Sequence, residues 1–182
     1  MITRRAILLA TAALAVALGA SAMPLRAQGD YNDLQMAHVA VIASNIDIRY
    51  AHLALALSEN ADIKAFAETM IRDHSAVNSA VGALARKLNV EAQDNPFSHQ
   101  LLAGAAKTTE RLSRLRGKAF DRAYAANEVA YHHTVNGLVG GTFIPRIANP
   151  EVKAAFEGAL TVFRGHEQHA EQMVRSVGAK GT

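Results

Sequence analysis

The sequence predicts an all-α protein folded as an antiparallel four-helix bundle. Its 182 residues are rich in alanine and include only four prolines and 5% aromatic residues, a balance that favours helices over strands. Apolar residues recur at helical spacing, and no segment shows the alternation typical of a strand. Half of the residues are apolar, which is enough for a core and argues against intrinsic disorder. The absence of cysteine excludes a disulfide scaffold and a cysteine zinc site.

Residues 1–27 are predicted to form a signal peptide. Arg4 and Arg5 precede an unbroken run of small and apolar residues over 6–20. Two possible cleavage sites follow, one after residue 22 and one after residue 27. The arginine pair suits either the twin-arginine or the general secretory route. The apolar run is short for a membrane span, so an uncleaved anchor is the alternative. We therefore expect a periplasmic protein, which could associate with the cell envelope.

Removal of the signal peptide changes the charge of the chain. The sequence holds 19 basic and 16 acidic residues, and three basic residues but no acidic ones lie in 1–27, which leaves 16 of each. A neutral chain lacks the basic footprint of a nucleic-acid-binding protein. One local excess remains, which either forms a solvated helix face or contacts an anionic envelope component: Lys107, Arg111, Arg114, Arg116 and Lys118.

The first two predicted helices cover residues 33–58 and the segment after Asn60. The first is apolar on more than one side, so it should contact several neighbours. The second begins with Asn60 as its cap and Asp62 in its first turn, where the helix dipole favours an acid. Its apolar residues follow steps of four and three, as in a coiled coil, and His74 occupies one of these inward positions.

Two further helical regions complete the predicted domain, which spans residues 31–178. A connection over 89–98 leads to a long third region over 99–138, with Gly117 as a break or kink, and Gly140-Gly141 should end it. The last helix starts at Asn149-Pro150-Glu151, which combines a cap, a proline at the first helical position and an acid in the first turn. His166 lies on its inward face.

Inward-facing histidines are the residues that could carry chemistry. His74 and His166 should point toward the bundle axis, where an imidazole without a partner is costly. Each is therefore either a core histidine that is hydrogen-bonded to a neighbour or a ligand of a metal ion. In the third region, Asp121, Tyr124, Glu128 and His132 form one stripe, and Asp47 lies beside the inward face of the first helix.

These residues define a hypothetical site for one transition metal ion, because imidazole and carboxylate ligands suit iron, copper, zinc or manganese. A standard di-iron site needs a Glu-x-x-His motif on each of two helices, and no acidic residue here is followed by histidine three positions later. We therefore expect a mononuclear site or none. The candidate ligands are His74, His132, His166, Asp47 and Asp121.

Three segments resemble a known family, the bacterial domain-of-unknown-function 4142 family. They are FAETMIRDH at 66–74, FDRAY at 120–124 followed by His132, and EVKAAF at 151–156 followed by His166. Asp47 stands where that family often has glutamate, and Thr161 stands where it often has proline. The resemblance implies an exported, ferritin-like helical bundle located in the envelope. It leaves the activity open, since the function of that family is not established.

The sequence favours a non-catalytic structural or interaction module of the envelope over an enzyme, because an oxidoreductase needs an open metal position and a substrate cavity, and the sequence indicates neither. The alternative is a protein that binds a single transition metal in its core and has a stress-related role. The two readings differ in whether the inward imidazoles converge on one point.

Overall fold

The computed structural model describes residues 30–179, which form five α-helices, one π-helical turn and no strand. The predicted all-α class is confirmed. The predicted signal peptide and its cleavage sites lie outside the described residues. The elements, in chain order, are α1 (Asp33–Leu57), α2 (Ala61–Leu88), α3 (Pro96–Ser113), α4 (Gly117–Leu138), η2 (Val139–Phe143) and α5 (Pro150–Ala179).

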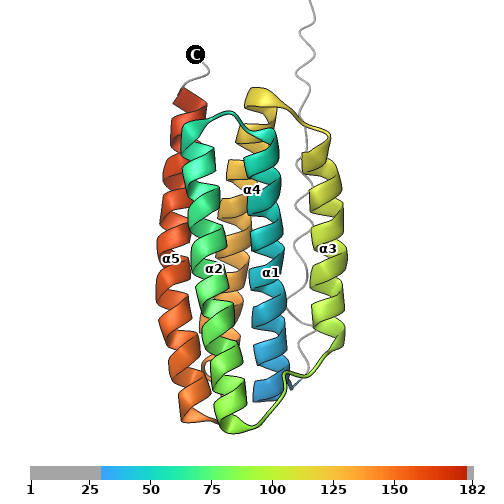
Figure 1. The fold of residues 1–182 in the computed structure, drawn as a ribbon, viewed down its shortest axis with the longest axis vertical. Helices are drawn as coiled ribbons and strands as arrows, with labels where there is room; N and C mark the ends of the chain where they lie inside the picture. The colour runs from blue at the N-terminus through green and yellow to red at the C-terminus, as the bar shows by residue number, and fades with distance from the viewer. Residues whose placement is uncertain (1–29, 180–182) are drawn as a thin grey trace, which may run out of the picture.

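Four of the helices enclose a common core (Figure 1). Contacts run from α1 to α2, from α2 to α5, from α5 to α4 and from α4 back to α1, so that these helices form a closed ring. Each helix of the ring is antiparallel to both of its neighbours (Figure 1). The fifth helix, α3, lies outside the ring against α1 and runs parallel to it (Figure 1).

The predicted third helical region is two helices rather than one. Residues 114–116 separate α3 from α4, and the chain reverses direction there. Gly117, which was predicted as a break, has a φ of +52°, a left-handed conformation that only glycine adopts at little cost. The connection before this region, predicted over 89–98, is shorter in the structure, because α3 begins at Pro96 rather than at residue 99. Asn95 caps this helix by accepting a hydrogen bond from the Ser98 N–H.

Polar caps fix the other helix starts where the sequence predicts them or close by. Asn60 accepts a hydrogen bond from the Asp62 N–H, and Asn149 accepts one from the Glu151 N–H. At the start of α1, Asn32 and Gln35 form a reciprocal capping box. Gly140-Gly141 does not stop the chain at once, because residues 139–143 continue as the π-helical turn before the loop to α5.

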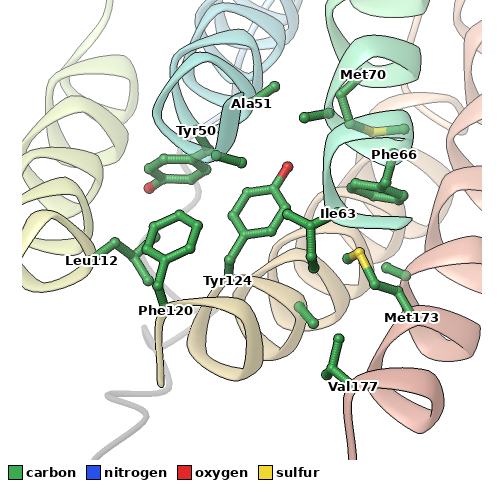
Figure 2. Packing of buried hydrophobic residues seen from close by; sticks show 14 of the residues in the cluster. Tyr50, Ala51, Ile63, Phe66, Met70, Leu112, Phe120, Tyr124, Met173 and Val177 are labelled. Atoms are coloured by element: carbon green, nitrogen blue, oxygen red, sulfur yellow. The ribbon is translucent and has the colours of Figure 1, made fainter. Parts of the chain in front are cut away.

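Two apolar clusters divide the core along its length. The first cluster joins all five α-helices near the α1–α2 turn and contains Phe66, Met70, Phe120, Tyr124 and Met173, with Leu112 of α3 at its edge (Figure 2). The second cluster lies near the opposite end and contains Met36, Val39, Phe143, Phe156 and Leu160. The buried polar residues described below lie between the two clusters.

One described helix, α1, is long and apolar enough to cross a membrane by length and composition. The contacts of α1 account for this character, because it touches α2, α3 and α4 and so has little surface that faces solvent. It also carries the fully buried Asp47. Its apolar sequence is therefore that of a core helix in this fold.

Candidate metal site in the helix core

A group of buried polar side chains lies near the middle of the four ring helices. Asp47 comes from α1, His74 from α2, Glu128 and His132 from α4, and His166 from α5. Each is at most 4% exposed. Burial of so many ionisable groups is unfavourable unless they bind one another or a ligand.

The three histidines face one another. One ring nitrogen from each of His74, His132 and His166 lies within 4.8 Å of the other two. Their ring centroids are 5.4–5.8 Å apart. His74 is held from its other side by Phe163, whose ring stacks on the imidazole at a centroid distance of 4.4 Å and an angle of 11°. The histidines therefore converge from three different helices.

Two carboxyl groups adjoin the histidines. Asp47 Oδ2 lies 2.6 Å from His74 Nε2 and 3.5 Å from His132 Nε2. Asp47, Glu128 and His132 form a second group whose ligand-type atoms lie within 4.8 Å of one another. His132 belongs to both groups, so the five side chains make one continuous cluster.

The two carboxyl groups have opposite protonation tendencies. Burial alone would raise the pKa of Asp47, but contact with His74 and the nearby His132 outweigh burial and lower this pKa to about 2. For Glu128, burial and then the negative charge of Asp47 raise the pKa well above its usual value. The cluster in the metal-free protein thus combines an ionised aspartate with a protonated glutamate.

Hydrogen bonds orient two of the imidazoles. His132 Nδ1–H donates to the backbone carbonyl of Glu128 at 3.0 Å, so that Nε2 carries the free lone pair. His166 Nε2–H donates to Asp73 Oδ2 at 2.9 Å, so that Nδ1 carries the free lone pair. In metal sites, the ring N–H that faces away from the ion usually donates to a backbone carbonyl or a carboxylate, and this outer partner fixes the orientation of the ring. Both histidines have such a partner. Burial lowers the pKa of His132, and it lowers that of His166 to about 4, so both rings are neutral near pH 7.

Several polar atoms of the cluster are buried without a hydrogen-bond partner. These atoms are both oxygens of Asp47, both ring nitrogens of His74, Glu128 Oε2, His132 Nε2 and His166 Nδ1. His74 Nε2 approaches Asp47 closely, but the geometry does not suit a hydrogen bond. Neutral imidazole nitrogens and a carboxylate are the donors that divalent transition metals prefer, so the residues present fit such an ion.

Comparison with known proteins identifies the family. Residues 18–173 match the family described as a domain of unknown function, DUF4142. The chain belongs to the DUF4142 family. No curated protein and no solved structure matches the chain. The predicted resemblance is thus confirmed, and the matched region covers the whole cluster of this DUF4142 protein.

The structure brings together four of the five candidate ligands that the sequence predicted in this DUF4142 chain. Asp121 lies elsewhere: it accepts a hydrogen bond from the buried Ser58 hydroxyl at 2.6 Å, near the turn between α1 and α2. Asp121 shares a face of α4 with Glu128 but precedes it by seven residues, about 10 Å along the helix. We therefore leave Asp121 out of the site.

Glu128 of the cluster, and Asp73, which binds His166 from outside it, were not among the candidates. Glu128 was assigned to the polar stripe but not to the ligands. The Glu-x-x-His motif has a spacing of three residues, and Glu128 precedes His132 by four. A spacing of four also places both side chains on one helix face, and this signal could have identified Glu128. Asp73 was noted only as the neighbour of His74, and nothing in the sequence shows that it reaches across to α5.

The five basic residues over 107–118 that were predicted to contact an envelope component lie away from the cluster. Their side chains are exposed along the second half of α3, the short turn and the start of α4. Arg114 pairs with Glu110, and Arg116 donates to the backbone carbonyl groups of Ser113 and Leu115. This segment is separate from the candidate metal site.

Proposed function

We propose that this protein is an exported, ferritin-like four-helix bundle that binds one divalent transition metal ion in its core. The ligands are His74, His132, His166 and Asp47. The observation that carries the proposal is the convergence of three buried imidazoles and a buried carboxylate from four helices, in which His132 Nε2 and His166 Nδ1 have no hydrogen-bond partner. A purely structural core would not need to bury these groups, since apolar side chains of similar volume are as stable or more stable.

The chemistry of the ligands narrows the choice of ion. Three imidazoles and a carboxylate suit zinc, copper, nickel or iron(II), whereas magnesium and calcium prefer sites made of oxygen ligands. The outer partners also support the proposal, because the Glu128 carbonyl and Asp73 fix the orientation of His132 and His166. Two of the nitrogen ligands are already deprotonated at neutral pH and would bind without losing a proton.

Glu128 has a separate role in this proposal. Its proton keeps the metal-free core from holding two adjacent negative charges. A bound divalent cation favours the ionised carboxylate, so metal binding releases this proton. The ionised pair of Asp47 and Glu128 then balances the charge of the ion within the core.

The test is metal binding by the mature protein with a matched pair of variants. Protein stripped with EDTA is titrated with Zn(II), and the bound metal is measured by elemental analysis and calorimetry. We expect one ion per chain. His132→Asn removes a proposed ligand, whereas His133→Asn alters the adjacent histidine, whose side chain is 81% exposed. The loss for His132→Asn should exceed the roughly 10- to 100-fold effect of removing an outer partner.

His133→Asn should bind like the original protein, and circular dichroism checks that both variants are folded. Far less than one ion per chain in the original protein would overturn the proposal. Equal affinities of a folded His132→Asn variant and the original protein would overturn the ligand assignment.

A second candidate function, contact with an anionic envelope component, rests on the exposed basic side chains of α3 and α4. Attraction between such a surface and anionic lipid weakens with salt. Sedimentation with phosphatidylglycerol vesicles, with phosphatidylcholine vesicles as the control, tests it. A variant with Lys107→Gln, Arg111→Gln and Lys118→Gln should lose the salt-sensitive binding. Equal sedimentation with both lipids would exclude this role.

A further inference from the structure

A small cavity lies against two of the proposed ligands. It has a volume of about 20 Å³, which is room for one water molecule. His74 and His132 form part of its wall, but Asp47, Glu128 and His166 do not. The cavity is therefore beside the set of ligand atoms rather than among them.

Most of the cavity wall is apolar. It is formed by Ala40, Ala43, Val135, Val139 and Phe163, together with Ser44 and Tyr131. The Tyr131 hydroxyl already donates to the backbone carbonyl of Ala43 at 2.8 Å. The two alanines of α1 leave the space that larger side chains would fill, and the π-helical turn begins at Val139 on the opposite helix.

We infer that this cavity is the binding position of a small neutral ligand on the metal ion, a molecule of one or two non-hydrogen atoms that carries a lone pair. The inference rests on the proposed function, because two of the proposed ligands, His74 and His132, also line the cavity. The volume sets the size limit, and the apolar wall offers little to stabilise a charge.

The surroundings of the cavity also favour a neutral ligand. An anion there would be buried against a mostly apolar wall and between two apolar clusters. A small anion such as fluoride should therefore bind poorly.

Nitric oxide is a suitable probe, because it is neutral, has two non-hydrogen atoms and gives a distinctive electron paramagnetic resonance signal with Fe(II). The stripped protein is loaded with Fe(II) without oxygen, and the bound iron is counted before nitric oxide is added. We expect one nitric oxide per bound iron, and no spectral change with fluoride, an anion within the size limit, at the same concentration. Ethyl isocyanide, which is neutral but larger, should not bind.

Variants of the cavity wall locate the binding position. Ala43→Val fills the cavity and should keep the iron but weaken nitric oxide binding at least 10-fold. Ala54→Val, at a buried alanine of α1 in the first apolar cluster, is the matched control and should keep both iron binding and nitric oxide binding. Val135→Ala enlarges the cavity and should admit ethyl isocyanide. This gain is measurable even if Ala43→Val does not fold.

The results separate this inference from the proposed function. Iron that binds in full but does not respond to nitric oxide would overturn the inference alone. Unchanged nitric oxide binding in a folded Ala43→Val variant, or exclusion of ethyl isocyanide by Val135→Ala, would place the ligand elsewhere and would also overturn it. Failure to bind iron, zinc or copper would overturn the proposed function and the inference together.

Discussion

The two buried carboxyl groups should respond in opposite ways when each is replaced by its amide in the metal-free protein. The pKa of Asp47 is lowered from 3.8 to about 2, where contact with His74 and the nearby His132 outweigh the effect of burial. One pKa unit corresponds to about 1.4 kcal/mol, so the ionised form contributes about 2 kcal/mol to folding at pH 7. This contribution is present above pH 3.8 and is lost as the pH falls toward 2.

Asp47→Asn should therefore lower the free energy of unfolding at pH 7 by about 2 kcal/mol. For a domain of this size, that loss lowers Tm by roughly 4–8 °C. Glu128 behaves differently, because burial raises its pKa well above the usual value. Its folded form holds a proton that the unfolded chain releases at neutral pH, so its contribution to stability falls as the pH rises. Glu128→Gln keeps a neutral side chain, and its Tm should equal or exceed that of the original protein.

The assay is urea and thermal unfolding, followed by circular dichroism, at pH 7 with EDTA present. Glu91→Gln alters an exposed carboxylate and is the control for loss of a negative charge. The reasoning is refuted if Glu128→Gln loses as much stability as Asp47→Asn. It is equally refuted if Asp47→Asn unfolds at the same urea concentration as the control.

Three further predictions concern His166, Ser58 and Asp73. Burial lowers the pKa of His166 to about 4, so the metal-free protein should lose stability as the pH falls from about 6.5 to about 4, by up to about 3 kcal/mol. His166→Gln should flatten this dependence in urea unfolding, and an unchanged slope would contradict the assignment. Ser58→Ala leaves the buried Asp121 without its hydrogen bond and should lower the free energy of unfolding by about 1–3 kcal/mol, with unchanged Zn(II) affinity in calorimetry. Asp73→Ala removes the hydrogen-bond partner of His166 and should weaken Zn(II) binding roughly 10- to 100-fold. Arg72→Ala removes only the exposed partner of Asp73 and should leave Zn(II) binding unchanged. Equal affinities of the two variants would argue that Asp73 does not orient His166.

The helices and their starts could be predicted because their signals are local. Asn60, and Asn149 with Pro150, act as caps through hydrogen bonds to residues two or three positions away. The division between α3 and α4 was harder, because apolar residues continue at helical spacing across it and residues 114–116 include no proline or polar cap. Only the left-handed Gly117 marks the reversal, and the sequence alone does not show whether a glycine bends a helix or ends it.

The candidate site could be predicted in part for a related reason. Periodicity shows which face of a helix points inward, and it correctly predicted that His74, His132 and His166 face the core. It does not show which level of one helix lies beside which level of the next, because loops and tertiary packing set that alignment. Asp121 was therefore grouped with residues two turns away along α4, and the contact between Asp73 and His166, 93 residues apart, could not be foreseen.

The position of the polar cluster between two apolar clusters bears on how a metal would act. Zinc fingers have almost no core, so the metal itself holds the fold together. Here each end of the ring has its own buried apolar cluster, and these contacts should align the helices with or without an ion. The proposed ligands should then lie together before metal is added, and treating metal-loaded protein with EDTA should lower Tm while leaving the helical circular dichroism nearly unchanged. A large loss of helix on addition of EDTA would instead mean that the two apolar clusters cannot hold the helices in register by themselves.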